Sequence, residues 1–136
     1  MNLDKQTVTE QHIVELVRRF YEVAAADERL HAVFDAAIDN WDAHHRIVEN
    51  FWSRTLLNTD RYHGSPYPIH ARLPLKIEQF DVWLQHFRQT ANEVLPVEAA
   101  AMAIERAEHM AESFKIGMFF DYYPPGGTSS TKPVGG

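Results

Sequence analysis

The sequence has 136 residues, enough for one domain with a buried core that could enclose a small ligand. Its formal net charge of -6 argues against nucleic acid and anionic membranes as partners, since both bind basic surfaces. The sequence contains no cysteine, which excludes disulfide bonds, thiolate metal sites and a cysteine nucleophile.

Apolar residues recur at three- and four-residue spacing along most of the chain, which is the spacing of one face of an α-helix. A capping box of Thr7 and Glu10 is expected at the start of the first helix, and Asp39 or Asn40 at the start of the third. No segment alternates with a period of two for long enough to be a strand, so we predict an all-α fold. The predicted helices span residues 9–25, 30–38, 40–57, 75–96 and 97–120.

The third predicted helix carries a histidine in an otherwise apolar stripe. The stripe consists of Trp41, His44, Val48, Phe51 and Thr55. An inward-facing imidazole needs a partner for its ring nitrogens, so His44 either bonds to a backbone carbonyl or faces a bound ligand. The adjacent His45 lies on a different face of the helix, and we expect it to face water.

Residues 58–74 form a break between two long helices. Gly64, Pro66, Pro68 and Pro74 prevent a long helix here, because proline removes a donor and disfavours helix in the residue before it. At most about one helical turn can form, around residues 69–71. His70 in this turn is either an exposed loop residue or an inward-facing metal ligand on a short, stiff turn.

The last residues differ in composition from the rest of the chain. Proline, glycine, serine and threonine dominate from residue 124 onward, and such a segment cannot bury enough apolar surface to offset its chain entropy. We therefore predict a domain over residues 1–123 and a disordered tail over residues 124–136. No apolar run is long enough to span a bilayer and the first residues lack a signal-peptide core, so we expect a cytoplasmic protein.

An ordered set of short motifs extends from about Ile13 to Met118. The motifs are Phe20-Tyr21, Phe34 before Asp35, Trp41-x-x-His44, Phe51-Trp52, Tyr62-x-Gly64-x-Pro66, His70-x-x-Leu73-Pro74 and Phe80-x-x-Trp83-Leu84. Together they resemble the group III truncated haemoglobins. The resemblance implies that residues 1–123 form a truncated globin, a two-over-two helical sandwich around haem b in which the proline-rich break replaces most of one helix.

The resemblance also implies roles for individual residues. His70 matches the proximal iron ligand, and Tyr21, His44 and Trp83 match the distal cluster that stabilises the bound ligand. The implied haem contacts are Phe34, Val48, Phe51, Arg72, Tyr62, Met110 and Phe114. Among the candidates for the haem propionates are Arg72, Tyr62 and Arg46, since arginine can bind a carboxylate through two hydrogen bonds. Met110 and Phe114 are equally well explained as plain core residues.

The function implied by the resemblance is the binding of O₂ and other diatomic ligands such as NO and CO, with detoxification of NO, O₂ or peroxide as its use. An NO dioxygenase or peroxidase-like activity would need an external electron donor. We expect a monomer or a weak oligomer. Two alternatives stay open: a non-catalytic O₂-binding or gas-sensing module, and a haem-free helical interaction domain in which His44 and His70 are structural.

Overall fold

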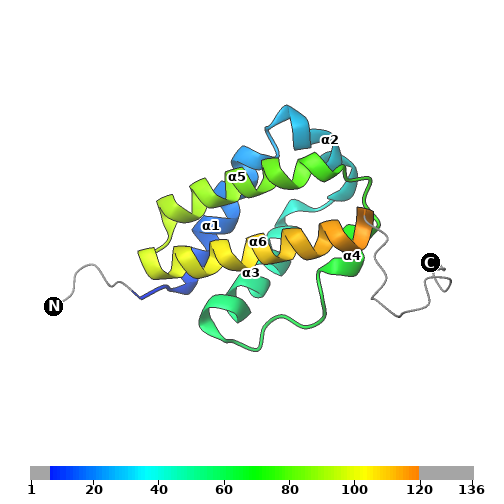
Figure 1. Cartoon of the computed structure of the whole chain (residues 1–136). Coiled ribbons are helices and arrows are strands. Elements are labelled where there is room, and N and C mark those ends of the chain that lie inside the picture. Colours follow the sequence, from blue (N-terminus) through cyan, green and yellow to red (C-terminus); the bar gives the residue numbers. More distant parts are fainter. Residues whose placement is uncertain (1–6, 120–136) are drawn as a thin grey trace.

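Residues 7–119 are described by a computed structural model, and every regular element among them is an α-helix (Figure 1). The all-α prediction is thus confirmed for this part of the chain, whereas the tail expected over residues 124–136 lies outside it. Within the described residues no helix is both long and apolar enough to cross a membrane. The helices are α1 (Glu10–Ala24), α2 (Glu28–Ala37), α3 (Trp41–Leu57), α4 (Tyr67–Ala71), α5 (Ile77–Val94) and α6 (Val97–Phe119).

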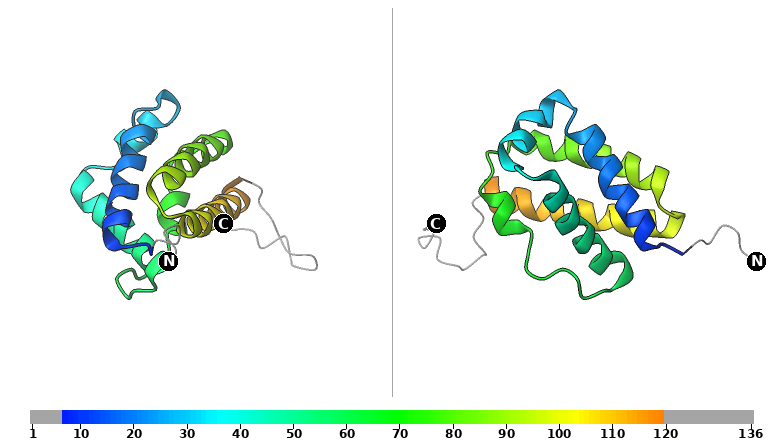
Figure 2. Two further views of the ribbon diagram at one scale, coloured as in Figure 1. Left: turned by 90° about the vertical axis from the view of Figure 1, so that its left-hand side faces the viewer. Right: turned by 180° about the vertical axis from the view of Figure 1, so that it is seen from behind.

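The four long helices form two layers (Figure 2). One layer consists of α1 and α3, and the other of the antiparallel pair α5 and α6, which makes the most extensive contact in the fold. The layers touch where α1 meets α5 and where α3 meets α6. The two short helices lie at the edges of this sandwich, α2 against α5 and α4 against α6.

The core combines large aromatic side chains with a stripe of small ones. The rings of Trp52 and Phe87 stack with their centroids 5.0 Å apart, which joins α3 to α5. Phe20 of α1 meets Phe87 edge to face at 5.7 Å. The buried side of α6 consists mostly of small alanine side chains, so α5 can approach α6 closely. Its buried alanines are Ala99, Ala100, Ala103, Ala107 and Ala111.

The start of α1 differs from the prediction. Thr9, not Thr7, caps the helix, and its hydroxyl accepts a hydrogen bond from the His12 backbone N–H at 3.3 Å. The Nδ1 atom of His12 in turn accepts from the Thr9 backbone N–H at 3.0 Å, so an imidazole takes the place that glutamate or glutamine usually fills. Glu10 instead accepts a hydrogen bond from Ser53 of α3 at 2.8 Å. For α3, Asn40 is the cap, as one of the two expected residues.

The break between α3 and α5 is held at its beginning by polar contacts. Asn58 ends α3 in the left-handed conformation, with φ 59°. The fully buried hydroxyl of Ser53 lies 2.8 Å from the hydroxyl of Thr59 as well as from Glu10, and thereby ties the break to α1 and α3. The expected single helical turn is present as α4, which starts two residues earlier than predicted.

Candidate functional site

Tyr21 of α1 and His44 of α3 meet between the two helices of one layer. The Tyr21 hydroxyl and His44 Nε2 share a hydrogen bond of 2.9 Å. Burial raises the pKa of Tyr21 above its usual range. Burial, followed by the nearby imidazoles of His45 and His70, lowers the pKa of His44 to about 4. Both side chains are therefore neutral near pH 7, and each can donate or accept a hydrogen bond.

Aromatic rings surround this pair. The Tyr21 ring has edge-to-face contacts with Phe34 of α2 at 5.6 Å and with Trp41 of α3 at 5.5 Å between centroids. Trp83 of α5 lies 5.8 Å from Phe20, the neighbour of Tyr21 in the sequence, and stacks on Phe87. Among the described residues Trp83 has no ring contact with Tyr21 or His44. The structure thus joins Tyr21 and His44 directly, and connects Trp83 to them through Phe20.

The expectation that His45 faces water is wrong. Both of its ring nitrogens are buried and have no hydrogen-bond partner among the described residues. Its ring packs 5.6 Å from the rings of Tyr21 and Trp41. His45 indeed lies on another face of α3 than His44, but that face is covered by side chains of α1. Burial and the nearby Arg18 of α1 lower its pKa.

The apolar stripe of α3 is not the most buried side of that helix. Trp52 and Ser53 are its buried residues, because this side packs against α1 and α5. Every stripe residue is half-buried. A row of partly exposed apolar side chains beside a core is typical of a ligand-binding surface. Further half-buried apolar residues pack against the core from the other helices and the break: Phe34, Tyr67, Leu75, Trp83, Met110 and Met118.

His70 is presented by the single turn of α4. Its Nδ1 atom is 2.7 Å from the Pro66 carbonyl oxygen, which can only accept, so Nδ1 carries the proton. In the neutral imidazole the Nε2 atom therefore has a free lone pair, and it has no hydrogen-bond partner in the described part of the chain. The ring lies 5.0 Å from Phe114 of α6. The His70 imidazole also contributes to the lowered pKa of His44, after burial and His45.

The other expected contact residues divide into two groups. Val48, Phe51 and Met110 are half-buried at the edge of the core, and Phe51 contacts the Tyr62 ring at 5.3 Å. The Phe51 ring also has the Arg106 guanidinium 5.9 Å from its centroid. Phe114 is buried and contacts His70, so it is both a core residue and a neighbour of the candidate iron-binding histidine.

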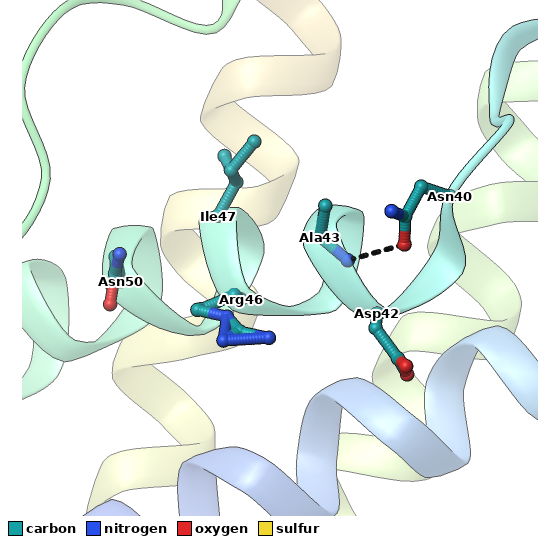
Figure 3. Close-up of a pocket in the computed structure, with 6 residues that line it drawn as sticks. All are labelled: Asn40, Asp42, Ala43, Arg46, Ile47 and Asn50. Atoms are coloured by element: carbon teal, nitrogen blue, oxygen red, sulfur yellow. Dashed lines mark hydrogen bonds between the residues drawn. The ribbon is translucent and has the colours of Figure 1, made fainter.

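The two arginines proposed for the haem edge are exposed. Arg72 is the C-terminal cap of α4 and forms no ion pair among residues 7–119. Arg46 lies on the outer side of α3, where it lines a shallow pocket of about 340 Å³ together with Asn40, Asp42, Ala43, Ile47 and Asn50 (Figure 3). Apart from Arg46, this pocket contains none of the expected site residues. It is therefore distinct from the candidate site residues His44 and His70.

Comparison with known proteins identifies the fold. The family model of bacterial-like globins matches residues 6–119. The chain belongs to this family. A curated relative of this globin is the group 3 truncated hemoglobin ctb of Campylobacter jejuni, which is 31% identical over 122 residues, covering 86% of this chain and 95% of that protein. The crystal structure of group III truncated hemoglobin from Campylobacter jejuni matches with a TM-score of 0.78 at 30% identity, covering 90% of this chain and 98% of that chain.

Membership of the globin family makes the protein a haem-based gas-binding protein, and the predicted truncated globin fold is confirmed. It also argues against the haem-free alternative. The residues present fit haem: an imidazole at His70 whose Nε2 atom has no hydrogen-bond partner among residues 7–119, half-buried apolar side chains from α2 to α6, and a neutral polar pair at Tyr21 and His44. Hydrophobic walls with few polar groups are what a flat, apolar cofactor requires.

Proposed function

We propose that this globin binds haem b through Nε2 of His70. The observation that carries the proposal is the 2.7 Å hydrogen bond from His70 Nδ1 to the Pro66 carbonyl. Such a bond to the second ring nitrogen fixes the tautomer and the orientation of a metal-binding histidine and raises its basicity. The proline that supplies the carbonyl also begins α4, so the partner and the ligand belong to one rigid turn.

Haem, when bound, supplies an iron atom that takes diatomic ligands and exchanges electrons. The task of the chain at the distal side is to donate hydrogen bonds to O₂, NO or CO. Tyr21 offers an O–H, His44 an N–H in the appropriate tautomer, and Trp83 an indole N–H. Each hydrogen bond contributes on the order of 1 kcal/mol net. Because burial keeps Tyr21 and His44 neutral, they donate without placing a net charge beside the ligand.

We propose that the protein uses this site to detoxify NO, O₂ or peroxide, drawing electrons from an external donor. One donor of the Tyr21–His44 pair is used within the pair, so two donors remain to retain a ligand, which suits a reaction better than rapid release. The same donors also suit a non-catalytic O₂-binding or gas-sensing module, so the two functions differ in chemistry and not in geometry. A cytoplasmic location and a monomeric or weakly associated state remain predictions.

The ligand assignment is tested by the His70→Ala variant. Without the imidazole, the protein is expected to lose haem, or to bind it only when imidazole is added. The absorption spectrum of the purified ferrous protein, with and without imidazole, measures this. A variant with the spectrum of the wild type would contradict the assignment of His70.

The proposed detoxification function is tested by mixing the ferrous, O₂-equilibrated protein with NO in a single turnover. Rapid, stoichiometric formation of nitrate supports the detoxification function. A slow reaction, with ligand exchange in place of nitrate formation, supports the non-catalytic module. The His70→Ala protein supplied with the same haem and imidazole serves as the control for reaction at haem that is not bound through a histidine of the protein.

A further inference from the structure

The helix that carries His70 has few anchors of its own. None of the five residues of α4 is fully buried, and its N-terminal cap makes no side-chain hydrogen bond. Its contacts with another helix are made mainly to α6. The position of His70 is therefore set largely by the contacts between α4 and α6.

Two residues of α4, one turn apart, rest on α6. The Tyr67 ring lies 5.4 Å from the Phe114 ring, and the His70 ring lies 5.0 Å from the same ring. Phe114 is buried and contacts Phe80 of α5 at 6.5 Å, so it is itself held in place. Tyr67 and His70 thus share one fixed support.

Tyr67 also fills a notch at Gly117, one turn beyond Phe114 on α6. A Cβ atom at this glycine would lie 2.6 Å from the Tyr67 hydroxyl oxygen, 3.0 Å from Cζ and 3.1 Å from Cε1. These distances are shorter than ordinary van der Waals contacts of about 3.5 to 4.0 Å. Any other residue at position 117 would therefore require the Tyr67 side chain to shift.

The backbone does not explain why glycine stands at this position. Gly117 lies inside α6 and has no positive φ, so alanine would be the better helix former there. What glycine provides at this point is the close approach of Tyr67. We infer that Gly117 and Tyr67 are positioning residues, which seat α4 on α6 and thereby set where the His70 imidazole lies.

This inference rests on the proposed role of His70, and its test uses the haem-loaded protein. In the Gly117→Ala variant the displaced Tyr67 should shift α4. We expect a changed iron–histidine stretching frequency in the resonance Raman spectrum of the ferrous protein. We also expect haem transfer to excess apomyoglobin to become about tenfold faster, which is within the range of effects of overpacking.

The matched control is Ser113→Ala, an exposed position on the same helix that tests helix propensity without touching Tyr67. It should change neither readout. In the Tyr67→Leu background, which removes the atoms nearest to Gly117, adding Gly117→Ala should have much less effect than in the wild type. Tyr67→Leu alone should also shift the stretching frequency, which keeps the inference testable if Gly117→Ala does not fold.

The inference is overturned if Gly117→Ala and Tyr67→Leu both leave the stretching frequency and the haem transfer rate at the values of Ser113→Ala. Failure of the proposed function would look different. In that case the wild-type ferrous protein would show no iron–histidine band that disappears in His70→Ala, before either positioning residue is changed.

Discussion

Tyr21 and His44, two of the proposed distal donors, are already joined by a hydrogen bond. This bond of 2.9 Å uses one of their two donors, so only one of the two remains for a bound ligand. Trp83 has no such partner among the described residues, and its indole N–H is free to donate. The two sides of the site are therefore unequal, although the residue types alone make them look equivalent.

This asymmetry leads to a prediction about O₂ dissociation. Trp83→Phe should speed the release of O₂ by about fivefold, since a lost hydrogen bond of about 1 kcal/mol appears mainly in the dissociation rate. Tyr21→Phe should have a smaller effect, because His44 is then released to donate in its place. The effects of Tyr21→Phe and of His44→Leu should consequently fail to add. Stopped-flow measurements of the dissociation rate give all of these values.

Thr90→Val is the matched control for this series. It removes a buried hydroxyl on α5, the helix of Trp83, which donates to the His86 carbonyl oxygen at 2.9 Å, and Thr90 is not one of the proposed site residues. Its dissociation rate should equal that of the wild type. Unchanged rates in the Trp83→Phe, Tyr21→Phe and His44→Leu proteins would show that these residues do not stabilise the bound ligand.

At the scale of the helices, the carboxylate of Asp27 links the turn between α1 and α2 to α5. Asp27 caps α2 by accepting from the Arg29 backbone N–H at 2.8 Å, and pairs with the Arg29 guanidinium at 2.7 Å. It also lies 2.7 Å from Nε2 of His86, one turn after Trp83 on α5. The Arg29 side chain first, and His86 second, lower the pKa of Asp27. Asp27 thus joins the end of α1 and the start of α2 to α5.

Asp27→Asn should lower the stability of the protein in a pH-dependent way. Asparagine caps helices about as well as aspartate, so the substitution removes mainly the charge. Because the pKa of Asp27 is lower in the folded state, its stabilisation is present above the unfolded value near 3.8 and is lost as the pH falls through the folded value. The melting temperatures of variant and wild type should differ at about pH 7, and the difference should begin to shrink as the pH falls below the unfolded value near 3.8.

Asp35→Asn, an exposed substitution on the same helix, controls for the general effect of removing one negative charge. Its melting temperature should follow that of the wild type at every pH. A gap between Asp27→Asn and the wild type that stays constant down to the acid limit would contradict the ion pair as its cause.

For the whole molecule, haem and fold should be strongly coupled. Apolar side chains that pack only partly against the core come from α2, α3, α4 and α6, so several helices would contribute to the proposed haem site. A ligand that binds only the folded state stabilises it by about 4.1 kcal/mol when its concentration is a thousand times its dissociation constant.

Removing haem should therefore lower the melting temperature by about 10 °C or more. The loss should be local at first: α4, which has no fully buried residue, should show faster amide hydrogen exchange than α5. Circular dichroism and hydrogen exchange on the protein before and after haem extraction measure both effects, and adding haem back should reverse them. Equal melting temperatures with and without haem would refute the coupling.

Much of this fold was predictable from local features of the chain, because helix formation depends on residue spacing and on prolines. The periodicity of Ile13 to Phe20, the cap at Asn40 and the single turn around His70 all follow from nearby residues. The roles of His44 and His70 came instead from an ordered set of motifs, since neither histidine is distinctive by itself.

Other features depended on which surfaces meet in space. Periodicity places His44 and His45 on different faces of α3, but only packing shows that α1 covers His45 and that Trp52 lies deeper than the apolar stripe. The Tyr67 contact at Gly117 likewise joins residues far apart in the sequence. The spacing of residues in a helix determines on which face of that helix each side chain lies. Whether the side chain is buried or hydrogen-bonded depends on which other helix covers that face, and the packing of the two layers determines this.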